Sequence, residues 1–143
     1  MTIPEDNRPS LLRRLAAVLY DGMLLIALWM AAGGLWIGFH GGQAAAPGDG
    51  PFRVYLLAVS WAFFTGFWVL GGRTLGMQAW RLRLVDANGE RVTLRAASHR
   101  FVTAILSWLP AGLGFLWALF DREALTWHDR LSKTYLYLEP KRR

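Results

Sequence analysis

The chain has 143 residues, a formal net charge of +6, 54% hydrophobic residues and a positive mean hydropathy of +0.24. A soluble protein of this length would be a single domain with too small an interior to bury so much apolar surface, so we expect lipid to solvate much of it. The chain has no cysteine, which excludes disulfides and thiolate metal sites. Its three histidines lack the spacing of metal ligands, and we expect neither a metal nor a cofactor.

The first predicted element is a membrane-spanning helix over residues 11–38. Its apolar run, Leu15 to Phe39, follows Arg13 and Arg14 and exceeds the about 20 residues that a span needs. A signal peptide is not expected, because its apolar region would cover only about 7 to 15 residues. Asp21 interrupts the run, and an acid inside a span is costly enough to be a functional-site hypothesis.

The second predicted span covers residues 52–70 and follows a glycine- and proline-rich loop. Basic residues gather before the first span and after the second, and only Arg53 belongs to the connection between them. By the positive-inside rule, the N-terminus and the basic insert over residues 71–97 are cytoplasmic, with anionic lipid head groups as the counter-charge. We expect no nucleic acid partner, because nucleic acid needs a contiguous basic face on a soluble domain.

The basic insert contains a strand pattern. Apolar residues alternate with arginines over residues 80–84, and Asn88-Gly89 is a favoured hairpin turn before residues 92–94. A second strand-like stretch covers residues 134–138 in the tail. We therefore predict a small cytoplasmic β-hairpin or sheet, with an irregular basic loop as the alternative.

The third apolar segment, residues 98–120, has two interpretations. As one kinked helix its 20 apolar residues would extend about 30 Å, enough to span, and the tail over residues 121–143 would be outside. Pro110 to Gly112 at its centre instead allows two half-length helices to form a re-entrant hairpin, whose turn surrounding protein must cover. We favour the hairpin because it leaves the basic tail in the cytoplasm.

The expected fold class is thus an all-α membrane protein with one domain over residues 1–143. It has two transmembrane helices, a third segment that is re-entrant or a kinked span, and the small cytoplasmic hairpin or sheet.

Asp21 needs a partner from outside its own helix. Arg14 lies on nearly the same face, but side chains tilt toward the helix N-terminus, so Arg14 points away from Asp21. The candidate partners are cationic residues near the cytoplasmic side: Arg100, His99, Arg73 and Arg130. An ion pair, a hydrogen-bonded neutral acid, and a proton or cation site are all open to Asp21, and a purely structural link between helices is the plain alternative.

Asp129 is the second acid of interest. It follows Thr126, which can cap a short helix, and precedes Arg130, with which it can pair. His128-Asp129 matches the dipeptide of metal-dependent phosphohydrolases, but those enzymes need further histidines and acids. We therefore expect no enzyme.

Four segments in this order form a specific set: Arg13-Arg14 with Asp21, Gly72 to Gly76 (GRTLG), Leu82 to Gly89 (LRLVDANG), and Thr126 to Leu131 (TWHDRL) with Thr134. Together they resemble the RDD family of bacterial membrane proteins, which is named for one arginine and two aspartates. The resemblance covers about residues 12–138. The sequence departs from the family pattern after Gly76, where Met77 and Gln78 stand in place of the usual basic residues.

The resemblance implies that the named arginine is Arg14, with Arg13 as second choice, and that the aspartates are Asp21 and Asp129. It also implies a bacterial inner-membrane location, both acids near the cytoplasmic side, and a role in transport or sodium/proton exchange. An Arg14–Asp129 pair would require a cytoplasmic tail. The predicted functional polar cluster comprises Arg14, Asp21, Asp129, Arg13, Arg100, His128 and Thr74.

One copy has too few helices to enclose a pathway, so transport would require a homo-oligomer or a partner membrane protein. The competing hypothesis is a non-transporting accessory or assembly subunit of a larger membrane complex. Trp29 with Trp36, and Trp61 with Trp68, give each predicted span one aromatic face that suits a partner surface.

Overall fold

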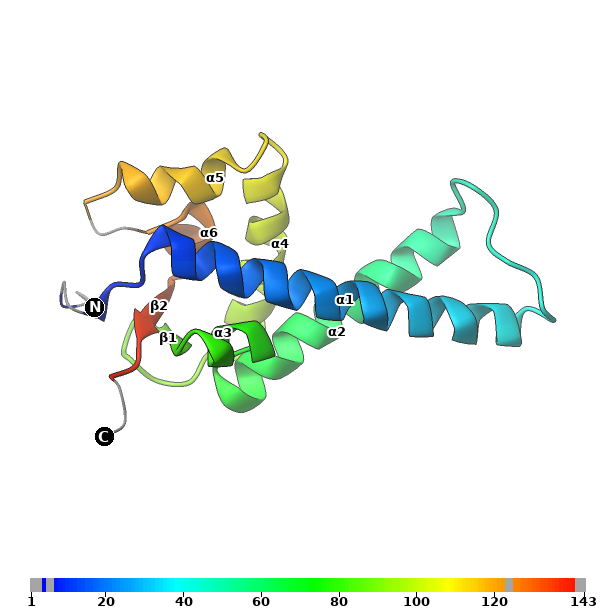
Figure 1. Ribbon diagram of the computed structural model, residues 1–143, viewed down its shortest axis with the longest axis horizontal. Helices are drawn as coiled ribbons and strands as arrows, with labels where there is room; N and C mark the ends of the chain where they lie inside the picture. Colours follow the sequence, from blue (N-terminus) through cyan, green and yellow to red (C-terminus); the bar gives the residue numbers. More distant parts are fainter. Residues whose placement is uncertain (1–3, 5–6, 123–124, 141–143) are drawn as a thin grey trace.

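The computed structural model describes Pro4, residues 7–122 and residues 125–140. Figure 1 shows two long helices, α1 (Leu11–Phe39) and α2 (Gly50–Gly71), that project together from the part of the molecule holding all other elements. The far ends of the two helices are joined by a loop. The long helical pair and the smaller elements therefore occupy opposite ends of the molecule.

Both long helices have residues suited to their ends. The Ser10 side chain caps α1 by accepting a hydrogen bond from the Arg13 N–H, and Asp49 caps α2 by accepting one from the Phe52 N–H. Pro51 lies in the first turn of α2, where its missing N–H costs nothing. At the other end of α2, Gly72 adopts φ 67°, the left-handed conformation that ends many helices.

The two predicted spans are confirmed as helices long and apolar enough to cross a membrane. Only 17% of the most apolar window of each is buried, so neither is the core helix of a water-soluble domain. On α1, Leu19, Met23 and Met30 are 71%, 64% and 74% exposed. An apolar surface of this extent fits lipid as its solvent.

The tryptophans of α1 pack against α2. The Trp29 Nε1–H donates to Ser60 Oγ over 2.9 Å, and the Trp36 ring lies 5.5 Å from the Tyr55 ring. On α2, the Trp61 Nε1–H donates to a serine of α4 (Leu94–Trp108) over 3.0 Å. The aromatic faces expected to suit a partner surface thus make contacts within the chain.

After α2 the chain forms the short helix α3 (Leu75–Ala79) and the strand β1 (Leu82–Asp86). This strand pairs antiparallel with β2 (Thr134–Leu138), with Leu82 opposite Leu138 and Asp86 opposite Thr134. The inward residues of the pair, Leu82, Leu84 and Leu136, belong to the hydrophobic core. The prediction of a small sheet is confirmed.

The predicted strand over residues 92–94 is wrong. The chain turns at Asn88-Gly89, with Gly89 at φ 82°, but it does not return along β1. Thr93 instead caps α4 by accepting a hydrogen bond from the Ala96 N–H, so the helix begins where the second strand was expected.

The third apolar segment divides in two. The backbone of residues 98–120 is described throughout, and no single helix runs along it, because α4 ends at Trp108 and the chain turns through Ala111 and Gly112 at φ 53° and 79°. The second part consists of α5 (Leu113–Leu116) and the 3-10 turn η2 (Trp117–Leu119). A re-entrant pair of half-length helices is therefore not confirmed.

The direction of α4 also differs from that of a span. Figure 1 shows α4 crossing α1 and not running beside it. Its 15 residues would extend about 22 Å, less than the about 30 Å of a hydrocarbon core. The turn after α4 brings Gly114 onto Ser107, since a Cβ at Gly114 would lie 2.6 Å from the Ser107 Cβ.

Candidate functional site

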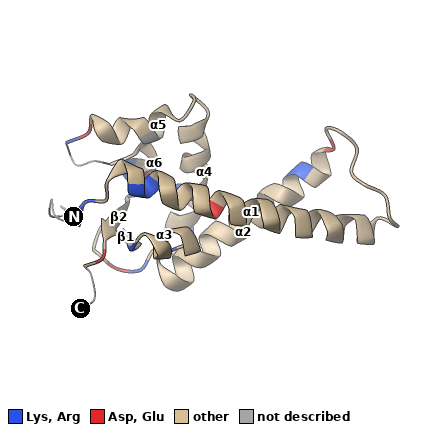
Figure 2. Cartoon of the chain, viewed as in Figure 1, with Lys and Arg blue, Asp and Glu red and all other residues tan. Residues whose placement is uncertain are grey.

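Two buried polar centres lie at the end of α1 that packs against the sheet and the short helices. The arginine centre consists of Arg14, Arg100 and Asp129, and the Asp21 centre consists of Asp21, Thr74 and Gly76. Figure 2 shows the charged residues of α1 near this end, away from the loop that joins α1 to α2.

Asp129 is positioned by the start of the short helix α6 (Trp127–Ser132). Its backbone N–H donates to Thr126 Oγ1 over 3.4 Å, while its carboxylate accepts a hydrogen bond from the Thr126 N–H over 3.1 Å. This reciprocal pair is a capping box, which holds both the helix start and the side chain. The capping box therefore holds the same carboxylate that binds the arginines.

Two arginines from different helices bind the two oxygens of this carboxylate. Arg14 Nη1 on α1 donates to Oδ2 over 2.7 Å, and Arg100 Nη1 on α4 donates to Oδ1 over 2.6 Å. The exposed fractions are 4% for Arg14, 2% for Arg100 and 0% for Asp129. Buried charges are tolerated only when paired, and this set of two cations and one anion retains one positive charge.

The arginines decide the protonation state of Asp129. Burial alone would raise the pKa of Asp129, but the attraction of Arg100 and Arg14 outweighs burial and holds that pKa well below its usual range. The neighbouring His128 is affected in the opposite sense. Burial, reinforced by Arg100, lowers the pKa of His128 to about 3, so the ring is neutral at physiological pH.

Hydroxyl groups complete the arginine centre. Arg100 Nη1 also donates to Thr134 Oγ1 over 2.9 Å, and the His128 ring nitrogens lie 3.0 Å from Thr126 Oγ1 and 3.3 Å from Ser107 Oγ. The centre thus joins α1, α4, α6 and β2.

Asp21 binds a different segment. Its Oδ2 accepts a hydrogen bond from the Thr74 hydroxyl, and its Oδ1 accepts one from the Gly76 N–H over 2.8 Å. The Thr74 hydroxyl oxygen in turn accepts the Met77 N–H over 3.2 Å. Asp21 therefore ties α1 to the start of α3.

As predicted, Asp21 binds residues from outside its own helix. These residues are not any of the cations named as candidate partners. Among the described residues Asp21 forms no ion pair. Arg100 is committed to Asp129, Arg73 pairs with Glu139 over 2.8 Å, and Arg130 pairs with Asp121.

Gly76 allows the close approach of α1 and α3. A Cβ at this position would lie 2.8 Å from Asp21 Cγ and would also overlap the backbone carbonyl of Ala17. Glycine is therefore needed here for space, since any side chain would push α3 away from Asp21.

A cleft of about 290 Å³ adjoins both centres. Four of its lining residues are ionisable, namely Arg14, Asp21, Arg100 and His128, and the remainder are largely apolar. Asp129 does not line it. Asp21 is thus the carboxylate at the cleft, while Asp129 is enclosed beneath it.

The structure brings four of the predicted cluster residues together: Arg14, Arg100, His128 and Asp129. Asp21 and Thr74 form the neighbouring centre. Arg13 belongs to neither, and forms no ion pair with the described residues.

Sequence reasoning missed three hydroxyl groups as members of the site: Ser107, Thr126 and Ser132. The sequence identified Thr126 as a helix cap, because a threonine three residues before an acid is a capping signal, but it did not indicate the contact of Thr126 with His128. Ser132 Oγ lies 2.6 Å from Thr134 Oγ1, a contact that nothing in the sequence indicates.

Comparison with known proteins gives one match. The model of the RDD family matches residues 8–133. No match was found among curated proteins or among solved structures.

Proposed function

Because the chain belongs to the RDD family and is a membrane protein by its two long apolar helices, we propose that it exchanges a cation for a proton in the bacterial inner membrane, with Asp21 as the exchanging group. The observation that carries this proposal is the position of Asp21. It is the carboxylate that lines the cleft, whereas Asp129 is clamped between two arginines.

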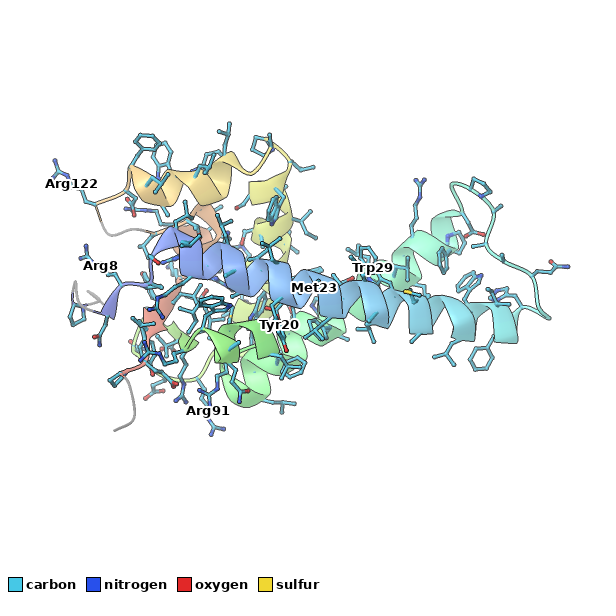
Figure 3. All side chains as sticks on the ribbon, viewed as in Figure 1. Arg8, Tyr20, Met23, Trp29, Arg91 and Arg122 are labelled. Atoms are coloured by element: carbon cyan, nitrogen blue, oxygen red, sulfur yellow. The ribbon has the colours of Figure 1, made fainter. Side chains whose placement is uncertain are left out.

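The distribution of charge supports a cytoplasmic location for both ends of the chain. Figure 3 places Arg8, Arg91 and Arg122 at the end of the molecule opposite the α1–α2 loop. Pairing of β1 with β2 supports a common side for the insert and the tail relative to a membrane that α1 and α2 cross. Under the positive-inside rule, that side is the cytoplasm.

The length of α1 supports a depth for Asp21 near the inner edge of the hydrocarbon core. The 29 residues of α1 extend about 43 Å, whereas the core needs about 20 residues. Counted back from Phe39, 20 residues end at Tyr20. Arg14 would then lie outside the hydrocarbon, and Asp21 at its boundary, where the cleft can admit water and ions.

Charge balance supports exchange of one proton for one monovalent cation. With Asp21 ionised, the two arginines balance Asp129 and Asp21, so the set has no net charge. Either a proton or a monovalent cation on Asp21 gives the same charge of +1. The two occupants thus compete for one carboxylate, and each turnover is electrically neutral.

A homo-oligomer would supply the rest of the pathway, because two spans of one chain do not enclose one. The outward side chains of α1, including Tyr20 and Met23 labelled in Figure 3, offer an apolar surface for a second copy.

The test is cation-driven proton movement in vesicles that contain the purified protein. We expect Asp21→Asn to abolish the flux, because the amide cannot take up a proton. Asp49→Asn is the matched control, since asparagine caps helices as well as aspartate and flux should be unchanged. Full flux in Asp21→Asn would overturn the proposal.

A second candidate function is an accessory or assembly subunit that transports nothing. It is favoured by the bonding of both Asp21 oxygens to α3, which suits a structural link. In that case Asp21→Asn would lower protein abundance, flux would be absent from the unmodified protein, and the chain would co-purify with a fixed larger complex.

A further inference from the structure

The lining of the cleft includes a stretch of α1 and a stretch of α4, each of which begins at an arginine of the arginine centre. On α1 its lining residues run from Arg14 to Leu25, and on α4 they run from Arg100 to Trp108. These stretches extend about 16 Å and about 12 Å along their helices. The cleft is thus basic at its Arg14 and Arg100 end, and the residues further along both stretches are apolar except Asp21.

The apolar part has open space. Gly22 lines the cleft, and a Cβ built on it would meet nothing within 4 Å. The cleft volume of about 290 Å³ is close to the lower limit of small-molecule pockets, about 300 Å³. It can hold one head group with the first part of one chain, but not a helix about 10 Å wide.

The basic part is suited to an acidic group. The arginine centre by itself keeps one positive charge after Asp129 is counted, and Asp21 forms no ion pair with it, since the Asp21 oxygens accept hydrogen bonds from Thr74 and Gly76. Trp68 also lines the cleft, is 5% exposed, and its Nε1–H has no hydrogen-bond partner among the described residues. A donor buried in this way favours an acceptor brought by a ligand.

We propose that the cleft binds one anionic phospholipid, with its phosphate at Arg14 and Arg100 and one acyl chain between α1 and α4. Charge complementarity selects the acidic head, and the apolar walls select the chain. A lipid is the amphiphile of this kind that surrounds a membrane protein, and its phosphate lies at the membrane surface, where the length of α1 puts Arg14 in the proposed arrangement. The site goes beyond the proposed exchange, because a lipid can occupy it whether or not Asp21 carries a proton.

The test measures lipid retained by the purified full-length protein. Native mass spectrometry in detergent compares phosphatidylglycerol with phosphatidylcholine of the same chains. We expect a one-to-one complex that favours phosphatidylglycerol by about tenfold, because the choline cation of phosphatidylcholine offsets the charge of its phosphate beside the two arginines. Equal retention of the two lipids would overturn the proposal.

Two glycines of α1 give a matched pair of variants. Gly22→Leu fills the cleft, whereas Gly34→Leu adds the same side chain to open space elsewhere on the helix. Both should fold, because neither new Cβ meets a neighbour. We expect Gly22→Leu to lower phosphatidylglycerol retention about tenfold and Gly34→Leu to leave it unchanged.

A third arm separates lipid from free phosphate. Glycerol phosphate without acyl chains should not displace the bound lipid at the same concentration. Its displacement of lipid, or undiminished retention in Gly22→Leu, would contradict a lipid site. This experiment measures lipid retention and not flux. A negative result therefore leaves the exchange proposal standing, and a failure to detect exchange leaves the lipid proposal standing.

Discussion

Arg14 and Asp129 are 115 residues apart in the sequence, yet they form an ion pair of 2.7 Å in which both side chains are buried. The pair connects the start of the first long helix to a short helix near the C-terminus. Arg100 reaches the same carboxylate from a third helix. The charged residues therefore hold together segments that the membrane-spanning helices alone would leave separate.

Removal of the shared carboxylate should cause the largest loss of stability. Asp129→Asn leaves two buried arginines without their anion, and a broken buried pair costs about 3–5 kcal/mol. We expect a clear drop in the thermal unfolding temperature in detergent. Glu139→Gln is the control, because the pairs of Glu139 with Arg73 and Arg83 are partly exposed and contribute about 1 kcal/mol or less each. Equal unfolding temperatures for the two variants would contradict this role.

Gly76→Ala should separate α3 from α1. The added methyl group would overlap Asp21 and the Ala17 carbonyl, and overpacking of this kind costs about 1–3 kcal/mol. Gly71→Ala provides the comparison, since a Cβ there meets nothing within 4 Å. The measurement is thermal stability of both purified variants. If Gly76→Ala is as stable as Gly71→Ala, the close approach of α3 to Asp21 is incorrect.

Acid should destabilise the fold through His128 before it protonates Asp129. The pKa of His128 falls from 6.5 to about 3 on folding, so the unfolded chain binds a proton that the folded chain refuses. The contribution of neutral His128 to the free energy of unfolding is fully present above pH 6.5. It decreases by about 1.4 kcal/mol per pH unit as the pH falls toward 3. Unfolding followed between pH 7 and 5 should show this slope in the unmodified protein and lose it in His128→Gln. The same slope in both would refute the assignment.

Protonation of Asp129 affects the stability of the fold at lower pH than protonation of His128 does. The pKa of Asp129 is depressed on folding, so its stabilisation is present above the unfolded value of 3.8 and is lost as the pH falls below it. The two effects thus occupy different pH ranges, and the His128 measurement is free of Asp129.

The sheet can be tested by cross-linking, because the chain contains no cysteine of its own. Arg83 lies opposite Tyr137, so cysteines at these positions should form a disulfide under mild oxidation. Cysteines at Arg83 and Tyr135 occupy diagonal positions about 7–8 Å apart and should cross-link much less. Efficient cross-linking in membranes would also place the insert and the tail on one side. Its absence would favour a tail on the opposite side.

The sequence allowed the long helices to be predicted because their signal is local. Runs of apolar residues, with Ser10 and Asp49 at the caps, specify α1 and α2 without reference to the remainder of the chain. The positions of β1 and β2 were also predicted from local alternation. Their pairing is a contact between segments about 50 residues apart, and period-2 alternation carries no information on the partner.

The surroundings of Asp21 illustrate why the site was only partly predictable. The sequence left an ion pair, a hydrogen-bonded acid and a cation site open for Asp21, and it named only cations as candidate partners, whereas Asp21 binds the Thr74 hydroxyl and the Gly76 backbone N–H. A backbone donor has no sequence signature of its own. The Arg14–Asp129 pair was predicted only through the resemblance to the RDD family, because the residues alone offered the adjacent Arg130 as the partner of Asp129.

The measurement that tests the central claim most directly is proton flux driven by a cation gradient, in vesicles holding equal amounts of unmodified protein and of Asp21→Asn. We predict flux that is independent of an imposed membrane potential in the unmodified protein and is absent in the variant. Equal flux in the two proteins would contradict exchange at Asp21.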